Sequence, residues 1–138
     1  MDKPICNNDL AKLLLRLAVG GLMLLHGLDK AHEGGLAFIE RLLRDRGWPE
    51  FIAYGVYVGE ILAPILILVG FWSRLGGLVL AVTMVMTIVL ASPGDWYTLN
   101  MHGALMTELN MLYMVGGLAI FFGGGGRYAL GTGLGRWS

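Results

Sequence analysis

Six side chains that can carry protons or form strong hydrogen bonds fall inside long apolar stretches of this sequence. They are Arg16, His26, Glu60, Glu108, Asn110 and Tyr113. If these stretches cross a bilayer, each ionisable group costs at least roughly 2.5–3.5 kcal/mol to insert, and such groups mark functional sites. At about 1.5 Å per residue, the four ionisable groups lie about 3 to 18 Å below the outer membrane surface. These depths predict one polar cluster in the outer half of a helix bundle, with Arg16 as its deepest member.

Glu60 lies in the middle of its apolar stretch. Pro64 follows four residues later and has no N–H, so the carbonyl of Glu60 loses its usual helical partner. A carboxylate at this depth can serve as a proton carrier, and we assign that role to Glu60 and Glu108. A purely structural ion pair is the alternative for Glu60. Arg16 is either its partner or a side chain that extends to the cytoplasmic headgroups.

Glu108, Asn110 and Tyr113 follow one another at the start of the last apolar stretch, among several methionines. Such a row can line a cavity for an apolar ligand with a polar head, and a quinone is the cofactor we suspect. With Arg16 and His26, Asn110 and Tyr113 would then bind the headgroup. The alternative is that Asn110 and Tyr113 only join neighbouring helices.

Metal and thiol chemistry find little support in the sequence. His26 and His102 are not accompanied by a ligand motif, so we expect no metal or haem site. His26 suits a proton relay or a headgroup contact, because its ordinary pKa lies near neutrality. Cys6 is the single cysteine, which excludes an internal disulfide, a CxxC pair and an iron–sulfur site within this chain.

The elements that must position these residues are membrane helices. Of the 138 residues, 56% are apolar and 14% charged, too few charges for the surface of a small soluble protein. Four stretches of about 27–31 Å match the thickness of a hydrocarbon core; they cover residues 10–28, 51–71, 75–92 and 102–122. The predicted fold is a single all-α integral membrane domain, an antiparallel bundle of four transmembrane helices. A short amphipathic helix is expected over 36–46, and a glycine-rich tail over 123–138.

Charge and aromatic residues predict the orientation. Tryptophans flank the apolar stretches and none falls within the middle of one, as in an aromatic belt. Six Lys and Arg residues fall on the side of the two termini and four on the other side. This favours a multi-pass protein of the plasma (inner) membrane with both termini in the cytoplasm. The zero net charge gives no reason to expect nucleic-acid binding.

The order of several short motifs resembles the DoxX family of small four-helix bacterial and archaeal membrane proteins. The resemblance runs from about Leu13 to Leu130. Its motifs are Leu15-Arg16-Leu17 with Gly20, His26-Gly27-Leu28-Asp29-Lys30, Gly47-Trp48-Pro49, Glu60 followed by Gly70 and Ser73-Arg74, Glu108, and the late glycines with Arg127-Tyr128-Ala129-Leu130.

The resemblance implies a component of a membrane oxidoreductase system, of the thiosulfate:quinone oxidoreductase or terminal quinol oxidase kind. No redox cofactor can be located from the residues, so electrons would come from a soluble redox partner or a bound organic group. Two other functions stay open. One is a non-catalytic membrane scaffold that anchors soluble redox proteins. The other is a small transporter, which with four helices per protomer would need a homodimer.

Overall fold

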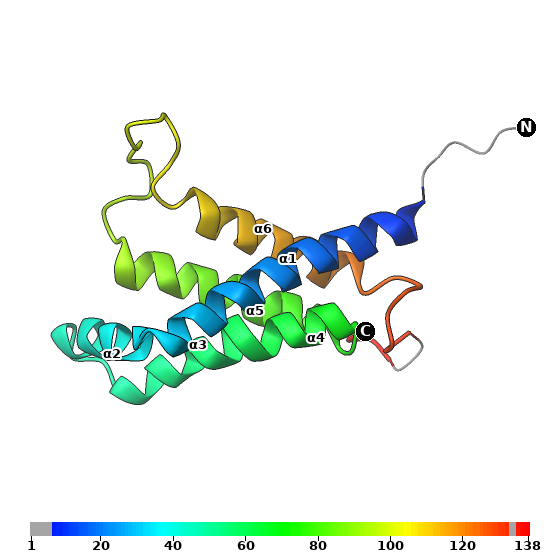
Figure 1. The fold of residues 1–138 in the computed structure, drawn as a ribbon, viewed down its shortest axis with the longest axis horizontal. Coiled ribbons are helices and arrows are strands. Elements are labelled where there is room, and N and C mark those ends of the chain that lie inside the picture. The colour runs from blue at the N-terminus through cyan, green and yellow to red at the C-terminus, as the bar shows by residue number, and fades with distance from the viewer. Residues whose placement is uncertain (1–6, 133–134) are drawn as a thin grey trace, which may run out of the picture.

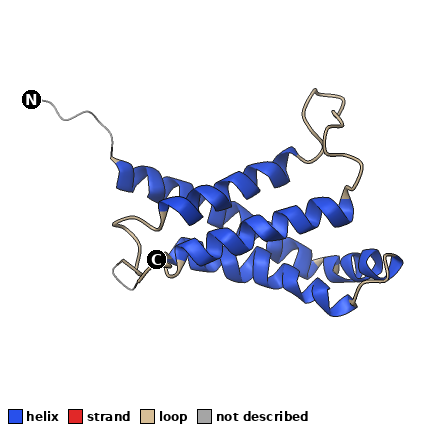
Figure 2. Ribbon diagram, turned by 180° about the vertical axis from the view of Figure 1, so that it is seen from behind, coloured by secondary structure: helices blue, strands red, loops and turns tan. Residues whose placement is uncertain are grey.

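The computed structural model describes residues 7–132 and 135–138, and its regular elements are all helical (Figures 1 and 2). The α-helices are α1 (Asn8–His32), α2 (Gly35–Asp45), α3 (Gly55–Tyr57), α4 (Ala63–Val69), α5 (Ser73–Ala91) and α6 (Glu108–Gly123). A 3₁₀ turn (Glu50–Tyr54) precedes α3, and a π-helical turn (Val58–Leu62) joins α3 to α4.

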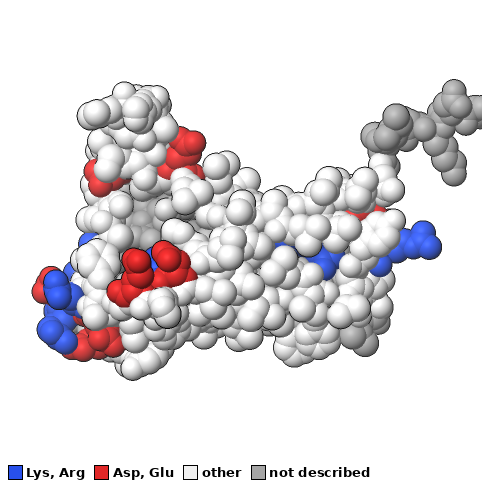
Figure 3. Space-filling view, viewed as in Figure 1, with Lys and Arg blue, Asp and Glu red and all other residues white. Residues whose placement is uncertain are grey.

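Three of the helical segments are long and apolar enough to cross a membrane. These are Asn8–His32, Glu50–Val69 and Ser73–Ala91, while α6 is a shorter apolar helix. On the face shown in Figure 3, charged side chains gather toward the two ends of the long axis and leave the middle uncharged. This distribution suits a hydrocarbon layer around the middle of the bundle, as the composition predicts.

Helix α6 begins at Glu108, six residues later than the predicted start at His102. The Asn100 side chain accepts hydrogen bonds from the backbone N–H groups of His102 and Ala104, at 2.9 and 3.1 Å. Gly103 then takes a left-handed conformation with φ of 79°. An Asn side chain that bonds the following backbone competes with helix formation, so the segment before Glu108 is a protruding loop (Figure 1).

Glycines allow the long helices to approach closely. A Cβ atom on Gly117 of α6 would lie 2.6 Å from the carbonyl oxygen of Gly77 on α5, a distance that no real Cβ keeps. On α1, a Cβ at Gly20 would lie 3.1 Å from the carbonyl oxygen of Pro64. Without a hydrophobic effect between helices in lipid, such close packing supplies much of the stabilisation. The buried core between these helices comprises Val19, Met23, Ala63, Ile67, Leu80, Met84 and Ile120.

Helix α2 lies at one end of the bundle (Figure 1), in the segment where the sequence predicts an amphipathic helix. Its Leu43 is fully buried against Ala53 and Leu90. Just after the helix, Arg46 donates hydrogen bonds to the carbonyl oxygens of Val89 and Leu90, at 2.6 and 3.0 Å. These carbonyl groups lie in the last turn of α5 and lack helical partners, so Arg46 fastens α2 to the end of α5.

Candidate functional site

An ion pair between a partly exposed lysine and a buried carboxylate joins α1 to the π-helical turn. The Lys30 Nζ atom lies 2.8 Å from the Glu60 Oε1 atom, and the Glu60 side chain is only 1% exposed. The second carboxylate oxygen, Oε2, is also buried and has no hydrogen-bond partner in the part of the chain that the structure describes. A buried acceptor without a partner is costly and uncommon, so this carboxylate calls for a functional explanation.

Lys30 reaches Glu60 because α1 is longer than the predicted apolar stretch. The sequence places Lys30 in a connection after Leu28, whereas the helix continues to His32. The signal for this extension is that neither glycine nor proline follows Leu28 until Gly34. A Lys at the end of a span keeps its charged head near the surface, and the side chain here is 30% exposed.

The backbone around Glu60 explains how its carboxylate is held. Pro64 cannot donate a hydrogen bond, and the helix responds with a π turn in which the Ala63 N–H donates to the carbonyl oxygen of Val58, five residues earlier. Gly27 of α1 packs directly against the backbone of Glu60, where a Cβ would overlap the carbonyl group. Gly59 packs in the same way against the Thr83 side chain of α5. The backbone that carries this carboxylate is therefore held between α1 and α5.

Arg16 does not pair with Glu60, contrary to one of the two predicted roles. Its guanidinium donates hydrogen bonds to four carbonyl oxygens: Ile67 and Leu68 at 2.8 Å each, Gly125 at 3.0 Å and Tyr128 at 3.2 Å. The side chain is 1% exposed, so it does not extend to the headgroups either.

Arg16 does not reach Glu60 because α1 contacts Glu60 at a different height along the helix. Arg16 precedes Gly27, which contacts Glu60, by eleven residues or about 16 Å of helix. Arg16 lies instead beside the end of α4, whose last carbonyl groups have no helical partners.

The other predicted site residues do not join the ion pair. His26 and Glu108 lie on the protein surface, and Asn110 and Tyr113 are half-buried. Tyr113 packs against the apolar core. The predicted single polar cluster is therefore not formed, because equal depth does not place side chains on facing sides of their helices. Within residues 7–132 and 135–138, no group of three or more His, Cys, Asp or Glu side chains could hold a metal ion. Cys6 lies outside the described residues.

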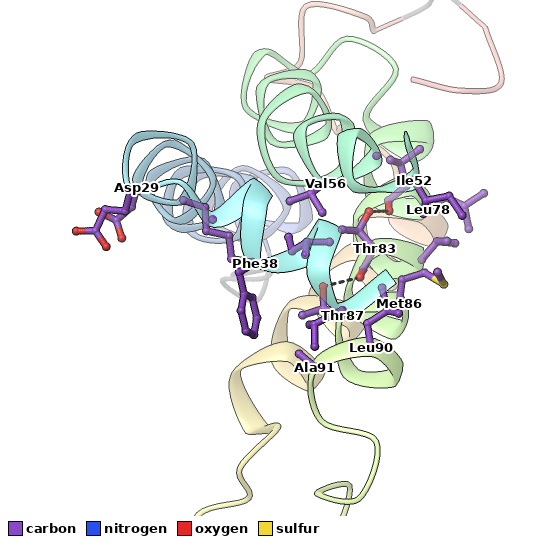
Figure 4. A pocket seen from close by; sticks show the side chains of 18 residues that line it. Asp29, Phe38, Ile52, Val56, Leu78, Thr83, Met86, Thr87, Leu90 and Ala91 are labelled. Carbon is purple, nitrogen blue, oxygen red and sulfur yellow. Dashed lines mark hydrogen bonds between the residues drawn. The ribbon is translucent and has the colours of Figure 1, made fainter. Parts of the chain in front are cut away.

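A cavity of about 780 Å³ opens beside the ion pair, between the end of α1, α2, the segment around α3, and α5 (Figure 4). Apolar side chains such as Phe38, Val56 and Met86 make up most of its wall. The polar lining consists of Asp29, Lys30, Glu33, Thr83 and Thr87. Sequence reasoning missed this cavity, because its residues come from four separate segments.

Comparison with known proteins shows the family of this chain. The model of the DoxX family matches residues 11–93, which is more than half of the chain and runs from the first turn of α1 past the end of α5. The chain belongs to the DoxX family. The resemblance in the sequence motifs is thus confirmed, although the match ends before α6 and the glycine-rich tail.

One curated relative is similar to this member of the DoxX family. It is "Putative oxidoreductase CatD" from Bacillus subtilis (strain 168), 30% identical over 83 residues. The match covers 59% of this chain and 59% of the relative, so this chain spans less than two thirds of the relative's length. No solved structure matches this chain.

Proposed function

We propose that this DoxX-family protein is a membrane redox-associated protein that binds a quinone-like, lipid-soluble carrier in the cavity beside Lys30 and Glu60. The observation that carries the proposal is a buried carboxylate, paired with a lysine on the wall of a large apolar cavity. The volume of this cavity lies within the range of roughly 300–1,000 Å³ that is usual for ligand pockets. The name of the Bacillus relative supports a redox role.

The chemistry of the cavity suits a ligand with an apolar body and a polar head. The Lys30 ammonium has three N–H donors, and Glu60 uses one of them. The others can donate to a carbonyl oxygen of a quinone headgroup. Glu60, behind Lys30, would then exchange protons with the headgroup through the ammonium. Such a pair stabilises the fold little by itself, because both ions lose hydration on burial, which favours a functional reason for its presence.

The proposal revises the expected site residues. Glu60 keeps its proton-handling role, and Lys30 takes the place expected for Arg16 and His26. Glu108, Asn110 and Tyr113 do not line the cavity, and we assign them no role in it. Electrons would come from a soluble redox partner.

The orientation is part of the same proposal. The start of α1 and the tail lie at one end of the bundle (Figure 1), where Arg16 holds Gly125 and Tyr128. We place that end in the cytoplasm and the cavity in the outer half of the plasma (inner) membrane, as the distribution of Lys and Arg favours.

The test is the binding of a short-chain benzoquinone to the purified chain in lipid nanodiscs, measured by titration calorimetry. Gly55 lines the cavity, and a Cβ there would meet no atom within 4 Å. Gly55→Phe should therefore fill the cavity without disturbing the fold and abolish binding. Glu60→Gln should weaken binding about ten-fold, because Lys30 loses the partner that orients its ammonium.

A matched control is Gly21→Phe, since Gly21 also has open space at its Cβ position but does not line the cavity. It should bind as the unmodified chain does. Failure of the unmodified chain to bind the benzoquinone, or equal binding by Gly55→Phe and Gly21→Phe, would contradict the proposal.

A further inference from the structure

Two threonines on α5 contribute hydroxyl groups to the cavity wall, and both hydroxyl protons are already used. The Thr83 hydroxyl donates to the carbonyl oxygen of Val79, and the Thr87 hydroxyl to the carbonyl oxygen of Thr83, each at 2.9 Å (Figure 4). Threonines commonly bond the backbone carbonyl four residues earlier in this way. A hydroxyl oxygen whose proton is donated elsewhere can still accept hydrogen bonds through its lone pairs. The α5 wall therefore offers acceptors, whereas Lys30 offers donors.

The two threonines differ in what covers them. Gly59 packs so tightly against Thr83 that a Cβ on the glycine would overlap the Thr83 side chain. Thr87 lies one helical turn further along the cavity wall, about 6 Å away along α5. Its oxygen accepts no hydrogen bond from the residues that the structure describes. Thr87 is thus the hydroxyl acceptor that the α5 wall leaves open to a ligand, in a cavity whose α1 side also carries the carboxylates of Asp29 and Glu33.

We propose that Thr87 is a specificity-determining residue that accepts a hydrogen bond from a hydroxyl group of the ligand. The inference rests on the proposed function and narrows its ligand class to headgroups that carry a hydroxyl, such as a hydroquinone. An oxidised quinone has only carbonyl oxygens, which accept but do not donate. To donate to such an oxygen, the Thr87 hydroxyl would have to give up its hydrogen bond to the Thr83 carbonyl oxygen, so the number of hydrogen bonds would not increase.

The expected preference follows from one additional hydrogen bond. A net contribution of about 1 kcal/mol corresponds to about five-fold tighter binding of the hydroquinone than of its quinone. Tighter binding of the reduced form also raises the midpoint potential of the bound couple. For a two-electron couple, a five-fold preference corresponds to about 20 mV.

The experiment compares a short-chain benzohydroquinone, its quinone and its dimethyl ether, each titrated into the purified full-length chain in nanodiscs. The unmodified chain should bind the hydroquinone about five-fold more tightly than either of the other two. Thr87→Val has the same shape without the oxygen and should abolish this difference by weakening the binding of the hydroquinone about five-fold. Thr87→Ser keeps the oxygen and should retain the preference. The exposed Thr98 lies in the loop before α6, away from the cavity lining, and Thr98→Val serves as the matched control.

The outcomes separate this inference from the proposed function. Equal affinity for the three compounds in the unmodified chain, or a preference that Thr87→Val leaves intact, overturns the role of Thr87 while the cavity remains a quinone site. Binding of none of the three compounds overturns the proposed function itself, and the role of Thr87 with it.

Discussion

Replacing Arg16 with methionine removes the donor that four carbonyl groups share. The hydrogen bonds to the carbonyl groups of Ile67 and Gly125 are buried, whereas those to Leu68 and Tyr128 are part-buried, so these two carbonyl groups can turn toward water. A buried polar group left without a partner costs about 1–3 kcal/mol. Two such groups at about 2 kcal/mol each give a loss of about 4 kcal/mol in the free energy of unfolding.

The assay for Arg16→Met is thermal unfolding of the purified protein in mild detergent. A loss of this size should lower the melting temperature on the order of 10 °C. The tail should also become easier to cleave with protease, because the guanidinium holds it against α4. Arg16→Lys should keep part of the stability, since an ammonium cannot reach four acceptors with the planar fork of a guanidinium.

Arg41→Met is the charge-matched control, because Arg41 lies on the surface of α2. Its melting temperature should stay close to that of the unmodified protein. A stable Arg16→Met protein that has lost quinone binding would refute the reasoning, because Arg16 would then be a ligand-binding residue and not a structural one.

Two further perturbations test the packing around the ion pair. Gly27→Ala should destabilise the protein by about 1–3 kcal/mol, because the added Cβ overlaps the Glu60 backbone. Gly21→Ala is the control and should leave the stability unchanged, because a Cβ at Gly21 meets open space. Equal melting temperatures for the two variants would show that Gly27 does not approach Glu60 closely. Lys30→Met should lower the free energy of unfolding by about 3 kcal/mol, because it leaves the buried Glu60 carboxylate without its partner. This value is at the low end of the range for broken buried ion pairs, because Lys30 is partly exposed. Adding Glu60→Gln to Lys30→Met should restore much of that stability in a double-mutant cycle, and additive losses would mean that the two groups do not interact.

Several features of this protein followed from the sequence because they depend on local chemistry. Apolar stretches of membrane length predict helices, since a spanning segment must satisfy its own backbone hydrogen bonds. Pro64 predicts a disturbed helix at Glu60, and the structure shows the π turn there. The ordered motifs indicate the DoxX family, and the family comparison confirms it.

The partners of the charged groups were decided by tertiary packing. The sequence gives the height of each residue along its helix but not which neighbour it faces. Arg16 and Glu60 look close in depth, yet Arg16 stands beside the end of α4, and Lys30, four residues beyond His26, faces Glu60.

The cavity is also a product of packing alone. Its wall combines α1, α2, the segment around α3, and α5, and no local pattern in any of them reveals it. The close approach of Gly27 and Gly59 to their neighbours determines where the helices meet. Side chains separated by many residues thereby share one site, because helix crossings depend on the shapes of both surfaces at once.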